Sequence, residues 1–155
     1  MTSLDVIAGT ASGGTLYGIG VGPGDARYLT LRAAALVNAV DVVAYFAKRG
    51  HQGNARRIVD PLMKPERAEV RFEYPLTDEV PAESPEYQRQ IGEFYRQTSD
   101  ALAALLRDGK SVGLLAEGDP FFYGSFMHMW RRLDGPSHFA EIAAHLHDHC
   151  GVGLA

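Results

Sequence analysis

Residues 15–40 read TLYGIGVGPGDARYLTLRAAALVNAV, and this stretch decides the fold class. An apolar run over residues 16–21 leads into a glycine-rich loop, and apolar residues at helical spacing follow as far as Val40. This order predicts a strand, a tight loop and a helix. Glycine allows a positive φ and a close approach of another group to the backbone. In an open α/β sheet, such a loop lies at the carboxyl end of its strand, where ligands bind.

The spacing of these glycines does not match two familiar nucleotide-binding motifs. The dinucleotide fingerprint needs a third glycine at its sixth position, but that position is Pro23 counted from Gly18 and Asp25 counted from Gly20. A P-loop would continue with Lys and then Ser or Thr, which are absent here. The loop therefore favours a ligand without an exposed polyphosphate and disfavours a nicotinamide oxidoreductase. A glycine-rich turn that serves only close packing is an equally open interpretation.

Composition indicates one soluble domain. The chain has 155 residues, 46% of them hydrophobic, and a formal net charge of −4. The negative charge argues against a nucleic-acid partner, and a single cysteine fits a reducing compartment. No apolar run reaches membrane-spanning length, and residues 1–13 lack the features of a signal peptide. We expect a loose leader over 1–13 and a cytoplasmic protein.

The rest of the chain alternates predicted strands with predicted helices. Strands are expected over residues 41–46, 69–74 and 111–116, and helices over 54–59, 86–108 and 126–133. The run over 111–116 has no alternation, which is typical of a parallel strand buried on both faces. The run over 69–74 alternates and is expected near an edge. The pattern predicts a mostly parallel α/β sheet flanked by helices.

Two further segments could carry a function. Cationic residues without an intervening acid follow the second strand, namely Lys48, Arg49, Arg56 and Arg57. They form either a solvated surface or a landing site for a polyanionic small molecule. After the strand at 111–116, Gly118 and Gly124 bracket a turn that presents Asp119. Because both special turns follow parallel strands, a shared crevice is expected.

The last residues are rich in histidine. His145, His147, His149 and Cys150 lie close together near the end of a predicted helical segment. Histidines two apart do not share a helix face, and structural zinc sites usually pair ligands from two separated segments. A polar helix terminus is therefore the favoured interpretation, and no metal is expected.

The motifs together resemble a known family. GIGVGPGDARYLTLRA, DVVAYF and AEGDPFFYGSFMHMWRRL look like segments of the tetrapyrrole methylases, over residues 14–133. The resemblance implies two α/β domains with S-adenosyl-L-methionine in the cleft between them. It also implies a methyltransferase of cobalamin biosynthesis, most like the members that methylate precorrin-2 at C20. A sibling specificity, for another precorrin or for uroporphyrinogen III, is the alternative.

The resemblance also implies roles for individual residues. Those expected to bind the cofactor are Pro23, Glu117, Gly118, Asp119 and Phe122. Glu117 departs from the glycine common in sibling enzymes. Those expected to bind the carboxylate-rich tetrapyrrole are Gly22, Asp25, Lys48, Arg49, Arg56 and Arg57. Some siblings carry an acid where this chain has Phe46, so no catalytic base is implied.

The resemblance ends before the chain does. Residues 14–134 are expected to form the amino-terminal domain of the family, and residues 135–155 a divergent helical tail. The second domain of the family has no counterpart in this sequence. The interpretation is a truncated domain, with an inactive fragment as the alternative. The family further implies a possible homodimer, whereas the net charge and the lack of a membrane-spanning run argue against nucleic-acid and membrane partners.

Overall fold

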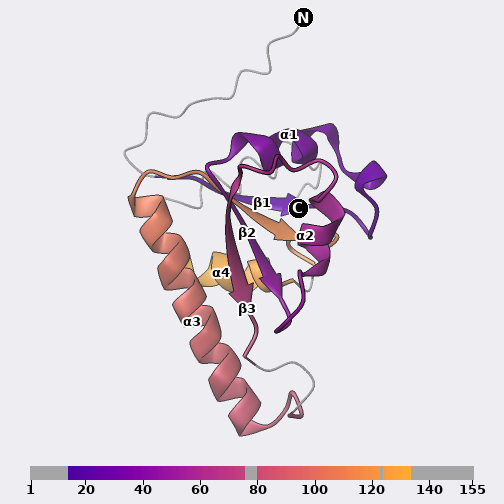
Figure 1. The fold of residues 1–155 in the computed structure, drawn as a ribbon. Coiled ribbons are helices and arrows are strands. Elements are labelled where there is room, and N and C mark those ends of the chain that lie inside the picture. Colours follow the sequence, from indigo (N-terminus) through magenta and orange to yellow (C-terminus); the bar gives the residue numbers. More distant parts are fainter. Residues whose placement is uncertain (1–13, 76–79, 123, 134–155) are drawn as a thin grey trace, which may run out of the picture.

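A computed structural model describes residues 14–75, 80–122 and 124–133. Its centre is a sheet of four parallel strands in the order β1-β4-β2-β3 (Figure 1). The strands are β1 (Leu16–Gly20), β2 (Val42–Ala47), β3 (Ala68–Glu73) and β4 (Val112–Ala116). The order places the first strand beside the last, so the loops that follow β1 and β4 leave the same edge side by side.

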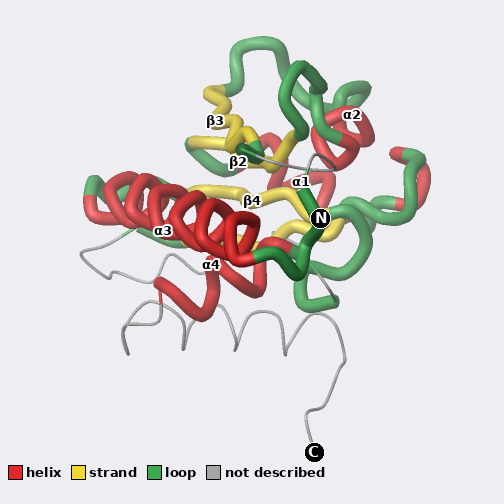
Figure 2. The backbone as a smooth tube through the Cα atoms, turned by 90° about the horizontal axis from the view of Figure 1, so that it is seen from below, coloured by secondary structure: helices red, strands yellow, loops and turns green. Residues whose placement is uncertain are grey.

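The helices cover both faces of this sheet. They are α1 (Leu31–Ala39), α2 (Asn54–Val59), α3 (Pro85–Arg107) and α4 (Ser125–Leu133), with a short 3-10 helix η1 (Ala26–Tyr28) before α1. Figure 2 shows the strands between the pair α1 and α2 and the pair α3 and α4. This three-layer arrangement buries both faces of a parallel sheet.

Alternation along β2 explains why both faces are apolar. Val42 and Ala44 lie in the core beneath α3 and α4, whereas Val43 and Tyr45 lie in the core beneath α1 and α2. Successive side chains of a strand point to opposite faces, so a strand covered on both sides needs apolar residues throughout. Strand β3 has one neighbour and a mostly exposed pattern, which confirms its expected position at the edge.

Capping residues mark the start of α1 and the end of α3, as the sequence indicates. Thr30 caps α1 by accepting the N–H of Ala33 at 3.0 Å. Helix α3 ends in a Schellman motif at Gly109, which has a φ of +76°. In that motif, Lys110 N–H donates to the Leu105 carbonyl at 3.1 Å and Gly109 N–H to the Leu106 carbonyl at 3.0 Å.

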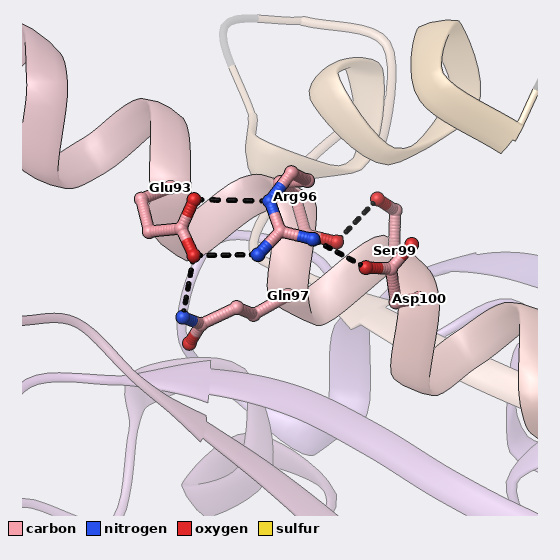
Figure 3. A network of polar contacts seen from close by, with 5 residues as sticks. All are labelled: Glu93, Arg96, Gln97, Ser99 and Asp100. Carbon is pink, nitrogen blue, oxygen red and sulfur yellow. Dashed lines mark hydrogen bonds and ion pairs between the residues drawn. The ribbon is translucent and has the colours of Figure 1, made fainter.

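The solvent face of α3 carries a polar network (Figure 3). Arg96 bridges Glu93 at 2.6 Å and Asp100 at 2.9 Å, and Gln97 also donates to Glu93 at 2.7 Å. Hydrogen bonds from Arg96 and then Gln97 lower the pKa of Glu93 to about 2. Exposed pairs of this kind add little stability, so α3 depends mainly on its buried face.

The predicted elements are confirmed with end shifts of one or two residues. The largest shift is at α1: the apolar residues at helical spacing begin at Leu29, but the helix begins at Leu31 because η1 occupies the preceding turn. The expected leader, the divergent tail and the histidine cluster lie outside the described residues. No helix within the described part of the chain has the length and apolar character needed to cross a bilayer.

Candidate functional site

The loops after β1 and β4 are joined by backbone hydrogen bonds. Gly118 N–H donates to the Gly22 carbonyl at 3.1 Å, and Val21 N–H donates to the Ala116 carbonyl at 2.9 Å. We call residues 21–24 and 116–119 the loop junction. The two turns therefore lie at one edge of the sheet. The expected crevice shared by both turns is not seen among the described residues, since none of residues 21–24 lines the cavity beside them.

The glycines of this region serve two different purposes. A Cβ on Gly18 would lie 2.7 Å from the ring of Phe126, and a Cβ on Gly20 would lie 2.6 Å from the carbonyl oxygen of Gly118. These two glycines allow close packing within the protein. Gly24 and Gly118 have positive φ, and a Cβ on either would meet nothing within 4 Å. Their backbone is open to an approaching molecule.

Asp25 interacts with its own loop. Its carboxylate accepts the backbone N–H of Arg27 at 2.8 Å and pairs with the Arg27 guanidinium at 2.8 Å. The side-chain bond from Arg27, followed by the backbone bond, lowers the pKa of Asp25 to about 2. Asp25 caps η1, so the structure gives it a local role and does not direct it toward a substrate.

Asp119 shapes the second turn. Its Oδ1 accepts the N–H of Phe121 at 2.8 Å, and its carbonyl accepts the N–H of Phe122 at 3.0 Å. The side chain therefore orders the turn before α4 and does not cap the helix, which begins at Ser125. Pro120 is buried, but Asp119 is exposed and the Phe122 side chain is 72% exposed. The turn thus presents a carboxylate and an aromatic ring to solvent.

A cavity of about 500 Å³ lies beside the loop junction. It opens over the carboxyl ends of β2 and β4, between the starts of α2 and α4. Glu117, Phe122 and Lys48 are the predicted site residues among the described residues that line it. The lining residues outside that prediction include Phe46, His51, Asn54, Tyr74 and Ser125.

Hydrogen bonds hold the polar groups of the cavity wall in place. Asn54 Nδ2 donates to Glu117 Oε2 at 3.2 Å, which links the start of α2 to the end of β4. His51 N–H donates to the Lys48 carbonyl at 3.0 Å, so both residues belong to one turn after β2. The wall therefore offers an anionic group and a cationic group at one carboxyl edge.

Arg56 does not reach this cavity. Its guanidinium binds Glu69 at 2.7 Å and Asp60 at 2.8 Å, and its side chain is only 12% exposed. The hydrogen bond that Arg56 donates to Glu69 raises the pKa of Arg56 above its ordinary value. The predicted substrate role of Arg56 is therefore corrected to a structural one. Arg49 and Arg57 are exposed and are not among the described residues that line the cavity.

Sequence reasoning missed most of the cavity wall. Ligands bind at the carboxyl ends of parallel strands, and the sequence analysis used this rule for β1 and β4 alone. Tyr74 follows β3, and Phe46 lies next to the last residue of β2. Applied to every strand, the rule indicates both residues. Ser125 carried no such signal. Among the described residues, no group of three or more potential ligands could hold a metal ion.

The model of the family "Tetrapyrrole (Corrin/Porphyrin) Methylases" matches residues 15–143. This chain belongs to that family. The tetrapyrrole methylase match covers both loops of the junction and every described residue of the cavity wall.

Two relatives are similar in sequence. A precorrin-2 C(20)-methyltransferase of Sinorhizobium sp is 46% identical over 120 residues, which cover 77% of this chain and 49% of the relative. A cobalamin biosynthesis protein, CobIJ, of Mycobacterium bovis is 40% identical over 77% of this chain and 24% of its own length. The chain thus spans about half of the first relative and a quarter of the second.

Solved structures share the fold. A cobalt precorrin-4 methyltransferase of cobalamin biosynthesis superposes with a TM-score of 0.52 at 24% identity, over 77% of this chain and 40% of that one. A cobalamin synthesis related protein from Corynebacterium diphtheriae gives 0.55 at 18% identity, over 91% of this chain and 59% of that one. At these sequence identities, the two similarities show only that the fold is shared.

Proposed function

We propose that this chain is the cofactor-binding and substrate-binding half of a methylase that uses S-adenosyl-L-methionine to methylate precorrin-2 at C20. The observation that carries the proposal is the loop junction, where Gly22 and Gly118 are hydrogen bonded at the carboxyl edge of the sheet. The 46% identity to a precorrin-2 C(20)-methyltransferase supports the substrate and the position of methylation.

The residues at this edge fit the chemistry of the methyl donor. S-Adenosylmethionine carries a positive sulfonium, which carboxylates, carbonyl oxygens and aromatic faces stabilise. Asp119 and Glu117 are exposed carboxylates, and the Phe122 ring is exposed beside them. A molecule can approach the backbone closely at Gly118, because a Cβ there would meet nothing within 4 Å. Pro23 is exposed on the facing loop.

When bound, the donor supplies an electrophilic methyl group. Asp119, Glu117 and Phe122 would hold the donor, which would give its methyl group to a substrate carbon in exchange for a proton and be left as the neutral thioether. A conjugated reduced tetrapyrrole is already electron-rich, so we assign this chain's residues to positioning and to exclusion of water. Phe46 and Phe126 supply apolar surface inside the cavity for that purpose.

The cavity supports a tetrapyrrole as the second ligand. Its volume lies within the range of small-molecule sites, and Lys48 and His51 provide cationic and titratable groups on one turn. A precorrin carries several carboxylates, which such groups attract. A homodimer, which the family implies, remains part of this proposal.

Calorimetric titration of S-adenosylmethionine into the chain tests the donor site. We expect saturable binding that weakens roughly tenfold in Asp119→Ala, because a charge-assisted contact is lost. Glu66→Ala, which removes an exposed acid outside the junction, is the matched control and should bind normally. Unchanged affinity in Asp119→Ala would remove Asp119 from the donor site.

A transfer assay tests the reaction. Precorrin-2 is incubated with the chain and with S-adenosylmethionine that carries a deuterated methyl group. We expect mass spectrometry and NMR to find the labelled methyl at C20. Label at another carbon would favour a sibling specificity, and donor binding without transfer would limit this chain to the binding step.

A further inference from the structure

Three hydroxyl groups meet at the wall of the cavity. Ser125, the first residue of α4, and Tyr74, which follows β3, both line the cavity. The Tyr74 hydroxyl is hydrogen bonded to Ser125 Oγ. The hydroxyl of Tyr95, a residue on α3 that is 9% exposed, lies 3.0 Å from the same oxygen. Ser125 is therefore the centre of the cluster.

The rings of both tyrosines are held firmly by aromatic neighbours. The Tyr74 ring stacks on Phe46 with centroids 5.5 Å apart and packs on Phe94 at 5.1 Å. The Tyr95 ring stacks on His128 at 4.3 Å. Burial raises the pKa of Tyr74 above its ordinary value of 10, so its hydroxyl keeps its hydrogen at neutral pH. A hydroxyl on a rigidly held ring is suitable for fixing the direction of a hydrogen bond.

Either hydroxyl can donate in each of the two contacts, and one arrangement directs the hydrogen of Ser125 toward the cavity. A serine hydroxyl has one hydrogen and two lone pairs. If both tyrosines donate to the two lone pairs, the hydrogen of Ser125 is directed away from them. The side of Ser125 that faces the cavity is then a hydrogen-bond donor, and the two incoming bonds strengthen it.

The other cavity residues indicate what this donor would bind. Lys48 lines the same cavity and favours a negatively charged group. Glu117 also lines the cavity and accepts a hydrogen bond from Asn54. Its negative charge disfavours a negatively charged group close to Glu117. Phe46 and Phe126 also line the cavity and provide apolar surface, which strengthens a polar contact by excluding water.

We propose that Ser125 donates a hydrogen bond to a peripheral carboxylate of the bound tetrapyrrole, and that Tyr74 and Tyr95 are positioning residues that orient Ser125. This inference rests on the proposed function and adds a substrate-binding contact to it. It makes Ser125 a determinant of which carboxylate side chain enters the cavity, and hence of how the macrocycle is oriented.

Fluorescence titration of uroporphyrin III, a stable tetrapyrrole with eight carboxylates, into the full chain tests the inference. We expect Ser125→Ala to weaken binding roughly tenfold, and Ser125→Thr, which retains the hydroxyl, to bind within about twofold of the unsubstituted chain. Ser99→Ala and Tyr17→Phe remove hydroxyls outside the described cavity lining and should leave binding unchanged.

A double-mutant cycle tests the positioning role. Tyr95→Phe should weaken uroporphyrin III binding several-fold in the unsubstituted chain but have no further effect in Ser125→Ala. An equal loss in both backgrounds would show that Tyr95 acts through general packing and would overturn its assigned role. Equal binding by Ser125→Ala and the unsubstituted chain would overturn the carboxylate contact itself.

Titration of S-adenosylmethionine into the same variants separates this inference from the proposed function. We expect donor affinity to change less than about twofold in Ser125→Ala. Donor binding without uroporphyrin III binding would overturn the carboxylate contact and leave the donor site standing. Uroporphyrin III binding that depends on Ser125, without donor binding, would support the contact and contradict the proposed methyl transfer.

Discussion

At Gly20 the absence of a side chain lets two loops join. A methyl group there would lie 2.6 Å from the Gly118 carbonyl oxygen and 3.2 Å from Cδ of Pro120. The first contact is with backbone, which cannot rotate away as a side-chain end can. Gly20 is therefore a structural requirement of the loop junction, although its own backbone is not the part that a ligand would approach.

Gly20→Ala should destabilise the protein by about 1–3 kcal/mol, because the loops must separate to admit the methyl group. Gly92→Ala is the matched control: Gly92 lies within α3, and a Cβ there would meet nothing within 4 Å. That change should stabilise the protein by about 0.5–1 kcal/mol. Urea denaturation measures both, and a neutral Gly20→Ala would contradict the packing at the junction.

Arg56 and Arg57 are neighbours in the chain, but substituting them should have different effects on stability. Arg56→Ala should cost about 1–3 kcal/mol, because it leaves Glu69 without its cationic partner in a partly buried position. Arg57→Ala, at an exposed position, should change stability by less than about 0.5 kcal/mol. If Arg56→Ala instead weakened tetrapyrrole binding and left the urea midpoint unchanged, the structural role assigned to Arg56 would be wrong.

Residue roles were the least predictable feature of the sequence. The cationic cluster was visible, but of the two acids that Arg56 binds, Glu69 lies on β3, thirteen residues further along the chain. Asp25 and Asp119 likewise bind backbone N–H groups two residues ahead. Turn-forming aspartates and ligand-binding aspartates have the same appearance in a sequence, so spacing could not separate them.

At the scale of elements, one side-chain contact ties β2 to β4 at the amino edge of the sheet. Asp41 Oδ2 accepts both the backbone N–H and the hydroxyl of Ser111, each at 2.7 Å. Asp41 N–H donates in turn to Ser111 Oγ at 2.9 Å. The backbone bond from Ser111, followed by its hydroxyl bond, lowers the pKa of Asp41 below the ordinary value of 3.8.

This contact predicts a dependence of stability on pH. Because the folded-state pKa of Asp41 is lowered, the stability it adds is fully present above pH 3.8 and is lost as the pH falls through the lower folded value. Asp41→Ala should cost about 1 kcal/mol at pH 7, a modest figure because the group is exposed to solvent. The difference from the unsubstituted chain should shrink on acidification. Urea titrations at a series of pH values measure it, and a difference independent of pH would contradict the assignment.

Hydrophobic periodicity was sufficient to predict the elements and the parallel sheet. Buried strands without alternation, an alternating edge strand and amphipathic helices each left a local signal. The strand order left no local signal, because the neighbour of β1 is β4, about a hundred residues away. The proximity of the two loops was predicted only through the general rule that ligands bind at the carboxyl edge of such sheets.

For the whole molecule, the loop junction and the cavity are two adjoining parts of one carboxyl edge. Glu117 and Phe122 belong both to the turn after β4 and to the cavity wall, so they connect the proposed donor site with the proposed substrate site. The chain belongs to the tetrapyrrole methylases and spans about half the length of the relative that is 46% identical. The central claim is that the junction itself holds the methyl donor.

Titration of S-adenosylmethionine into the nitrogen-15-labelled chain, followed by NMR of the backbone amides, tests that claim most directly. We predict saturable shifts at Gly22, Gly24 and Gly118 together with Asp119, Phe121 and Phe122, while the exposed face of α3 around Arg96 stays unchanged. Absence of shifts in both loops, or shifts confined to α3, would contradict the account.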